Sequence, residues 1–181
     1  MAASGFALFE TAIGQCGIGW AERGVVSVQL PDSSPDRLRA RLRRRVPGGQ
    51  EVEPTAELQR AVEEIVALID GAPRDLSGIA LDMEGVPPFE QRVYALARAI
   101  APGQTRTYGE LATELGDPGA ARAVGQAMGR NPFPLVVPCH RVLAAGGQLG
   151  GFSAPGGTQT KQRLLRIEGA LPEPPLALFD P

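Results

Sequence analysis

No regular element can cross the segment Gly85-Val86-Pro87-Pro88, which separates two kinds of hydrophobic pattern. Each proline lacks a backbone N–H and restricts the residue before it, so a helix or strand ends here. Before the segment, short apolar runs broken by glycine are typical of strands. After it, apolar residues recur every three or four positions, as in amphipathic helices. We therefore predict domains at residues 1–85 and 86–170, and a loosely ordered, proline-rich tail at 171–181.

The first domain opens with apolar runs that predict a small antiparallel sheet. Gly14 and the step Glu22-Arg23-Gly24 have the composition of hairpin turns between these runs. Leu76–Met83 alternates between apolar and polar residues and predicts a further strand. The opening runs are Phe6–Ile13, Cys16–Trp20 and Val25–Leu30.

Two helices are predicted in the same domain. Pro35–Arg45 carries Leu38 and Leu42 four positions apart, which is typical of a surface helix. Pro54–Glu57 has the composition of a helix start, and the apolar residues that follow, up to Ile69, lie on one face. The arginines of the first helix could form a nucleic-acid patch. A solvated face is the favoured interpretation, because charge runs usually face water.

The second domain is predicted to be mostly helical, so the chain as a whole belongs to the α+β class. Apolar residues from Phe89 to Ile100 form one stripe. Thr107 starts another helix, with Glu110 at capping-box spacing. A turn with two glycines then leads to a short helix at Ala120–Gly129. This is the organisation of a helix-turn-helix, but the pattern is common and indicates DNA binding only weakly by itself.

Composition and charge limit the class of protein. With 43% hydrophobic and 21% charged residues, the chain can bury a core, which excludes disorder of the whole chain. The net charge of −2 does not indicate nucleic-acid binding, although residues 104–168 hold seven basic and four acidic residues, a balance of +3. Neither a membrane span nor a signal peptide is visible, so we expect a soluble, cytoplasmic protein with no membrane partner.

The cysteine and histidine content constrains metal and disulfide chemistry. Cys16 and Cys139 are too few for a disulfide framework, and the single histidine, His140, excludes a His-rich metal site. A zinc site of both cysteines, the histidine and a carboxylate stays open, but neither cysteine lies in metal-ligand spacing. We predict no metal and no cofactor, with Cys16 as a structural residue.

The most informative residue is Cys139, which lies between Pro138 and two basic residues. Prolines at 132 and 134 also hold the approaching chain extended. Nearby cations lower the pKa of a thiol, and a neighbouring histidine such as His140 can generate the nucleophilic thiolate. A buried, inert cysteine beside a chance histidine is the alternative, since cysteine is among the most buried residue types.

The segment Pro138-Cys139-His140-Arg141-Val142 resembles the active-site signature of the O6-alkylguanine-DNA alkyltransferases, the methylated-DNA–protein-cysteine methyltransferases. The resemblance extends in order over roughly residues 87–170, and several separate motifs at the family's spacing argue against chance. The other matching segments are Pro88-Phe89, Thr107–Ala112, Ala121–Gly125, Asn131-Pro132, Gly150–Ser153, Lys161, Leu164-Leu165 and Glu168-Gly169. In this family the N-terminal domain is ribonuclease H-like, which we expect of residues 1–85.

The resemblance implies a direct-reversal repair reaction. Cys139 would attack the alkyl carbon on guanine O6 and keep the alkyl group, so that each molecule acts once. By the family's pattern, His140 takes the thiol proton through a water, and Glu168 orients His140. Asn131 ties the helix-turn-helix to the active-site loop. Tyr108 donates a proton toward guanine N3 and rotates the target phosphate.

The resemblance also implies how the DNA is held. The partner would be double-stranded DNA that contains O6-alkylguanine, and O4-alkylthymine would be a further substrate. Arg122 matches an arginine finger that fills the gap left by a flipped-out base. Ala121, Ala123 and Gly125 would let its helix press close to DNA. The protein would be a monomer in solution and could cluster along DNA.

A further set of residues is implied to form the substrate base pocket. Backbone groups at Cys139 and Val142, with Ser153, would hold the edge of the base, and Met128 and Pro134 would line the pocket. Two other functions stay open. A non-catalytic sensor would bind alkylated DNA without transfer, and an unrelated cysteine hydrolase would turn over without needing Tyr108.

Overall fold

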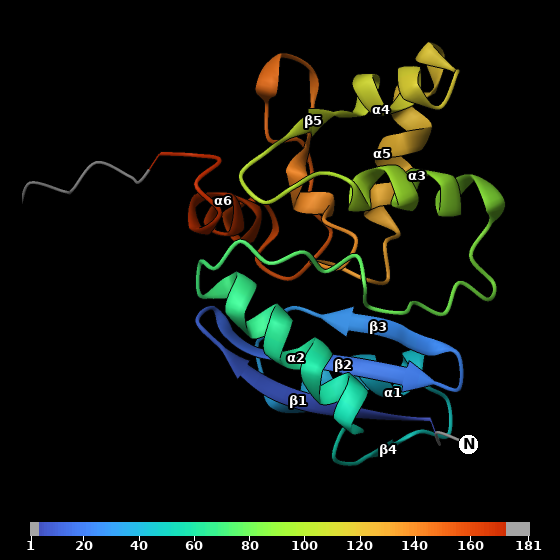
Figure 1. Cartoon of the computed structure of the whole chain (residues 1–181), viewed down its shortest axis with the longest axis vertical. Helices are drawn as coiled ribbons and strands as arrows, with labels where there is room; N and C mark the ends of the chain where they lie inside the picture. The colour runs from blue at the N-terminus through green and yellow to red at the C-terminus, as the bar shows by residue number, and fades with distance from the viewer. Residues whose placement is uncertain (1–3, 173–181) are drawn as a thin grey trace, which may run out of the picture.

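A four-stranded sheet with two helices forms the first half of the chain in the computed structural model, which describes residues 4–172 (Figure 1). Its strands are β1 (Gly5–Thr11), β2 (Gly14–Ala21), β3 (Gly24–Gln29) and β4 (Gln50–Glu51). The order is β3-β2-β1-β4, in which β4 alone pairs in parallel. Both predicted hairpins are confirmed, because Thr11 pairs with Gly14 and Ala21 pairs with Gly24.

Helices α1 (Pro35–Arg45) and α2 (Ala56–Ile69) pack on opposite faces of this sheet and confirm the two predicted helices. Glycine is required beneath α1. A Cβ atom on Gly17 would lie 2.5 Å from Cδ1 of Leu42, and Gly19 is covered in the same way. The helix therefore approaches the sheet more closely than side chains at these positions would allow. This close packing brings the end of α1 towards the second half of the chain.

The prediction of a strand at Leu76–Met83 is wrong. A single parallel bridge forms there, between Val25 and Leu81. A turn breaks the extended conformation, because the Ile79 N–H donates to a carbonyl three residues earlier at 3.1 Å. The guanidinium of Arg98 then donates to three carbonyl oxygens of the segment at 2.8 to 3.2 Å. The backbone groups of residues 76–79 thus bond to a turn and an arginine, while the Ala80 carbonyl and the Asp82 N–H bond to Val25 of β3.

The second half is mostly helical and completes a mixed α+β fold. Its helices are α3 (Pro88–Arg98), α4 (Tyr108–Glu114), α5 (Ala121–Gly129) and α6 (Gly157–Ile167). Two short strands, β5 (Arg106–Thr107) and β6 (Val142–Leu143), pair in parallel. Single 3₁₀ turns lie at η1 (Pro118–Ala120), η2 (Cys139–Arg141) and η3 (Ala145–Gly147).

Helices α4 and α5 pack together across the predicted turn. The Oγ1 atom of Thr107 accepts from the Glu110 N–H at 3.1 Å, as an N-cap does. The second half of the capping box does not form, because the Glu110 carboxylate accepts from Arg106 Nε at 2.8 Å. Helix α5 begins at Ala121, one residue later than predicted, because the 3₁₀ turn η1 occupies the preceding residues.

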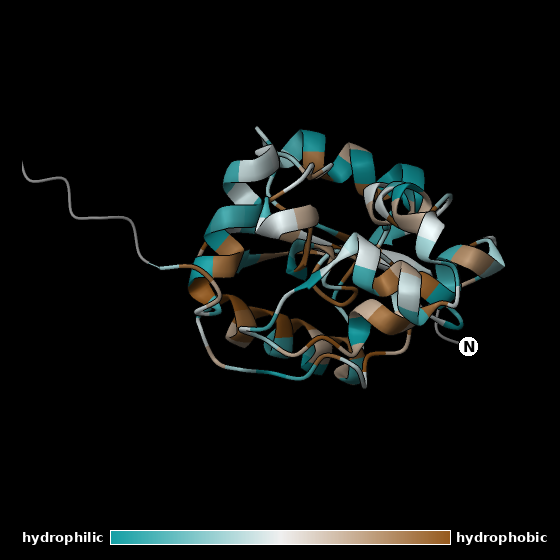
Figure 2. Ribbon diagram, turned by 90° about the horizontal axis from the view of Figure 1, so that it is seen from above, coloured by the Kyte–Doolittle hydropathy of each residue, from teal (hydrophilic) through white to brown (hydrophobic). Residues whose placement is uncertain are grey.

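One buried hydrophobic cluster runs through both halves. The Val28 N–H on the edge strand β3 donates to the Pro132 carbonyl at 3.0 Å, which ties the sheet to the approach of Cys139. Figure 2 shows hydrophobic and hydrophilic residues alternating along the helices, as amphipathic packing requires. Within residues 4–172, no helix combines the length and the apolar character that a membrane span needs. Most of the predicted tail, from residue 173 onward, lies outside the described residues.

Candidate active site

The side chain of Asn131 organises the loop that leads to Cys139. Its Nδ2 donates to the Val137 carbonyl at 2.9 Å, and its Oδ1 accepts from the Phe133 N–H at 2.8 Å. Leu135, between them, has a φ of 75°, a left-handed conformation that leucine rarely adopts. The loop is therefore held in a defined, strained shape, and it delivers Cys139 to the first position of η2.

The thiol of Cys139 is buried, and the residue is 7% exposed. Burial raises its pKa above the ordinary value of a cysteine. The Asn131 side chain, the positive charge of Lys161 and the backbone N–H groups of Cys139 and His140 act in the opposite direction. Because burial dominates, the resting group is a thiol that needs a base before it can act as a nucleophile.

A buried His140–Glu168–Arg141 array stands directly after the cysteine. His140 Nε2 lies 2.8 Å from Glu168 Oε1, and the three side chains are 1%, 3% and 6% exposed. Burial by itself would raise the pKa of Glu168, but hydrogen bonds from Arg141 and His140 lower it to about 2. Glu168 is therefore a carboxylate at neutral pH.

The next feature is the protonation state of His140 and the ring nitrogen that carries its proton. Burial lowers the pKa of His140, and the neighbouring Glu168 only partly opposes this effect, so His140 is neutral at pH 7. Its Nε2 faces a carboxylate oxygen, which assigns the proton to Nε2. The buried Nδ1 has no hydrogen-bond partner among the described residues. It therefore presents a free lone pair, as a general base must.

Two side chains of this site were not predicted as site residues. The guanidinium of Arg141 binds Glu168 through two hydrogen bonds, and Lys161 is fully buried with its Nζ 2.7 Å from the Val142 carbonyl oxygen. Burial lowers the pKa of Lys161 to about 8. A signal for it exists in the sequence: Lys161 lies three and four positions before Leu164 and Leu165, on the apolar face of α6.

Two cavities meet at Cys139. One, the base cavity, has a volume of about 410 Å³ and is lined by five of the predicted site residues. The other, the arginine cavity, has a volume of about 190 Å³ and contains Pro134, predicted for the same pocket as Met128. Val142 is fully buried and lines neither. The base cavity is lined by Tyr108, Gly125, Met128, Gly129, Cys139, Gly151, Phe152 and Ser153. The arginine cavity is lined by Val28, Gln29, Leu30, Arg41, Arg45, Gly129, Arg130, Asn131, Pro134, Cys139, Phe152, Ser153, Ala154 and Pro155.

Arg122 lies away from both cavities, in the first turn of α5. Its side chain is exposed and makes no hydrogen bond or ion pair within residues 4–172. Ala121, Ala123 and Gly125 are partly exposed on the same helix, while Ala127 and Met128 are buried. One face of α5 therefore exposes Arg122 among small residues. Gly125 and Met128 of the same helix line the base cavity.

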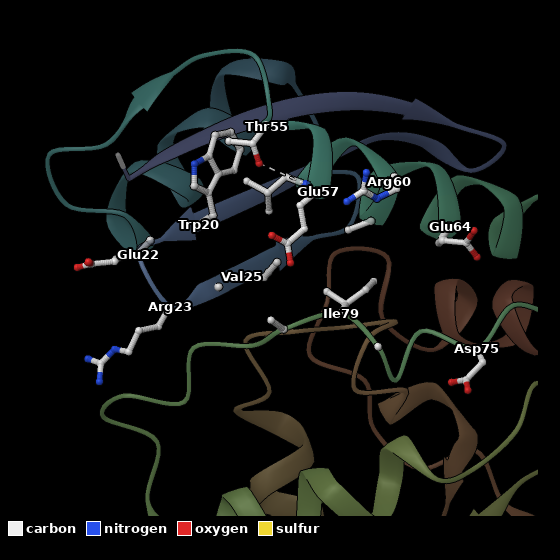
Figure 3. Close-up of a pocket in the computed structure, with 16 residues that line it drawn as sticks. Trp20, Glu22, Arg23, Val25, Thr55, Glu57, Arg60, Glu64, Asp75 and Ile79 are labelled. Carbon is white, nitrogen blue, oxygen red and sulfur yellow. Dashed lines mark hydrogen bonds between the residues drawn. The ribbon is translucent and has the colours of Figure 1, made fainter. Parts of the chain in front are cut away.

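A third cavity, of about 590 Å³, lies between α2, the β2–β3 turn and residues 75–80 (Figure 3). Four acidic residues, Glu22, Glu57, Glu64 and Asp75, and two arginines, Arg23 and Arg60, are among those that line it. No cysteine or histidine lines it. The other cysteine, Cys16, is completely buried in β2, and burial raises its pKa to about 12, which keeps it a protonated thiol at neutral pH. Within residues 4–172, no group of three or more metal-ligating side chains is gathered.

The comparisons with known proteins agree with the site's chemistry. A family model described as "6-O-methylguanine DNA methyltransferase, DNA binding domain" matches residues 88–170. A methylated-DNA–protein-cysteine methyltransferase of Mycolicibacterium paratuberculosis is 46% identical over 120 residues, which are 66% of this chain and 70% of the relative.

Two solved structures are similar over most of the chain. The O6-methylguanine methyltransferase of Mycobacterium tuberculosis has a TM-score of 0.74 and 32% identity, covering 98% of this chain and all of that one. The structure of Mycobacterium tuberculosis OGT in complex with DNA has a TM-score of 0.72 and 32% identity, covering 91% of this chain and 92% of that one.

Proposed function

Because the chain belongs to the methylated-DNA–protein-cysteine methyltransferase family, we propose that it repairs O6-alkylguanine in DNA by moving the alkyl group irreversibly to Cys139. One observation carries the proposal. Cys139 lines a cavity beside a neutral His140, whose Nε2 lies 2.8 Å from the ionised Glu168 and whose Nδ1 is unpartnered. This arrangement provides a nucleophile, a base and a group that orients the base.

The transfer step balances as a direct displacement. His140 takes the thiol proton at Nδ1 through a bridging water, and the thiolate forms a bond to the alkyl carbon. The bond from that carbon to O6 breaks, and its electron pair stays with guanine. Guanine gains one proton, so the products are neutral guanine and a thioether on Cys139. No group in the site reverses the thioether, and each molecule acts once.

The base cavity suits the guanine leaving group. We assign Tyr108 as the proton donor toward guanine N3, because this residue lines the same cavity as Cys139 and burial raises the pKa of its hydroxyl, which keeps it protonated. A donor there stabilises negative charge as it develops on the ring. Ser153 and the backbone of Val142 hold the base edge. Met128 packs against the ring, and Pro134 borders the base from the arginine cavity.

The base must leave the duplex to reach this cavity. We assign α4, the turn and α5 as a helix-turn-helix that binds the DNA. Arg122 enters the gap left by the flipped base, which its exposure and lack of an ion pair support. Ala121, Ala123 and Gly125 allow close approach, and Asn131 couples the end of α5 to the Cys139 loop through its hydrogen bond to Val137.

Other parts of the proposal concern the whole chain. Residues 1–85 form a ribonuclease H-like domain, supported by the β3-β2-β1-β4 order with helices on both faces, and residues 86–170 form the transfer domain. The protein acts as a monomer that can cluster along DNA. O4-alkylthymine is a second substrate, because it presents the same kind of alkyl–oxygen bond.

Intact-protein mass spectrometry tests the function directly. The protein is mixed with a duplex that carries one O6-methylguanine, and the expected result is a gain of one methyl group per chain, mapped to Cys139. Cys139→Ala should gain nothing while keeping its affinity for DNA. An unchanged mass together with tight binding of the lesion would favour the sensor instead.

A further inference from the structure

Cys139 can be approached from two directions, and the proposed repair uses one of them. The base cavity and the arginine cavity share Gly129, Cys139, Phe152 and Ser153. A guanine in the base cavity leaves the adjoining arginine cavity open beside the same cysteine. Its volume of about 190 Å³ exceeds what a methyl group needs, since a single water occupies about 30 Å³ of liquid.

The arginine cavity is positively charged. Arg41, Arg45 and Arg130 line it, and no aspartate or glutamate does. Two of the arginines have their own partners, because Arg41 lies 3.3 Å from Asp32 and Arg130 lies 2.8 Å from Glu90. Within residues 4–172, the third has no ion-pair or hydrogen-bond partner. Arg45 is therefore the charge available to a ligand.

The charges of the cavity act close to the reacting cysteine. Burial raises the pKa of the Tyr94 hydroxyl to about 12, and the charges of Arg130 and Arg45 oppose this while Cys139 adds to it. The charges of both arginines and of Cys139 thus act on the same buried hydroxyl, that of Tyr94. Arg45 is the last residue of α1, so the first half of the chain contributes this charge to a cavity that it shares with the second half.

The geometry of displacement determines where a substituent goes. Sulfur, the attacked carbon and O6 lie in line, so any group on that carbon points sideways from this axis. The guanine fills the base cavity, and the arginine cavity opens beside the sulfur. A substituent that carries a carboxylate would meet a guanidinium without a partner, and such charge-assisted hydrogen bonds are among the stronger ones in proteins.

We infer that the arginine cavity receives the substituent of the transferred alkyl group. Because of Arg45, the preferred substrates are O6-alkylguanines whose alkyl group carries a carboxylate, such as O6-carboxymethylguanine. The inference rests on the proposed function. The thiolate forms a bond to the methylene carbon, the carbon–O6 bond breaks with its electron pair on guanine, and guanine gains the proton lost by the thiol. The product is S-carboxymethylated Cys139, with its carboxylate beside Arg45.

Single-turnover transfer tests the inference with the full-length protein in excess. Three duplexes are compared, which carry O6-methylguanine, O6-carboxymethylguanine or O6-carbamoylmethylguanine, a neutral amide of nearly the same shape. The wild type should transfer the carboxymethyl group about tenfold faster than the carbamoylmethyl group, as one charge-assisted hydrogen bond allows. Arg45→Gln should remove this preference, and Arg45→Lys should keep part of it.

Arg44→Gln is the matched control, because Arg44 is the exposed neighbour of Arg45, does not line the cavity and carries the same charge. It should leave the preference unchanged. An equal fall of all three rates in Arg45→Gln would mean that Arg45 binds the DNA backbone or supports folding, and would overturn the inference. If the wild type transfers methyl groups but transfers carboxymethyl and carbamoylmethyl groups equally fast, only the inference about Arg45 is overturned. If it transfers no methyl group, the proposed function itself is overturned.

Discussion

The guanidinium of Arg141 holds both oxygens of the Glu168 carboxylate, with Nε 2.9 Å from Oε2 and Nη2 2.7 Å from Oε1. A third hydrogen bond, from Nη1 to the Ile100 carbonyl at 2.7 Å, fixes the guanidinium itself. Glu168 also binds His140, so the arginine determines the position of the base through the carboxylate. Arg141 is therefore a positioning residue for His140, the proposed general base.

Replacing Arg141 with glutamine should strongly destabilise the fold. The substitution leaves a buried carboxylate without its main partner, which costs about 3–5 kcal/mol in comparable buried pairs. Urea unfolding measures the loss. Arg106→Gln is the control, because Arg106 forms an exposed pair with Glu110 and should cost less than about 1 kcal/mol. Equal losses in the two variants would contradict a structural role for the buried pair.

Acid should unfold the protein partly through Glu168. Its pKa in the folded state is about 2, below its ordinary value of 4.5, so it stabilises the fold fully above pH 4.5. This contribution, about 3 kcal/mol from the shift, is lost as the pH falls from 4.5 towards 2. Unfolding free energies of the wild type and Glu168→Gln, measured against pH, should differ in slope across this window. Glu53→Gln, an exposed change, should keep the wild-type slope.

Local patterns predicted most helices and both hairpins, because capping and periodicity act within a few residues. The Pro35–Arg45 helix and the Gly24 turn follow from their own sequences. The strand expected at Leu76–Met83 failed for the opposite reason. A strand needs a partner along its length, and the alternation of a segment does not show that a turn and the side chain of Arg98 will take the backbone hydrogen bonds of residues 76–79.

The site was predictable only where a motif covers it. Cys139 and His140 are adjacent in sequence, and Glu168 entered through the resemblance. The Arg141–Glu168 contact joins residues 27 positions apart, and no local pattern indicates it. Arg45 lies in the other half of the chain, and only the packing of α1 on the sheet brings it to the arginine cavity.

His140 should control the pH dependence of transfer. Its pKa is lowered by burial, so the neutral base persists below the ordinary histidine value of about 6.5. The single-turnover rate should stay level through pH 6.5 and fall only at lower pH, as His140 becomes protonated. His140→Gln should lower the rate by about 10²–10⁴ and remove this acid limb. An unchanged limb in that variant would assign it to another group.

Arg122 should act on base flipping more than on general DNA affinity. It is exposed without an ion pair, and filling the gap in the stack is the role we propose for it, so Arg122→Ala should slow transfer from a duplex by about tenfold or more. A free O6-benzylguanine base needs no flipping, and its transfer rate should stay within twofold of the wild type. The slope of log affinity against log salt concentration for duplex binding should change little. Loss of a phosphate contact would lower this slope by about one, and the proposed role of Arg122 is in the base stack and not at a phosphate. Equal losses on the free base and on the duplex would show that Arg122 supports the site itself. Arg92→Ala, which removes an exposed arginine of α3, is the control and should change neither rate.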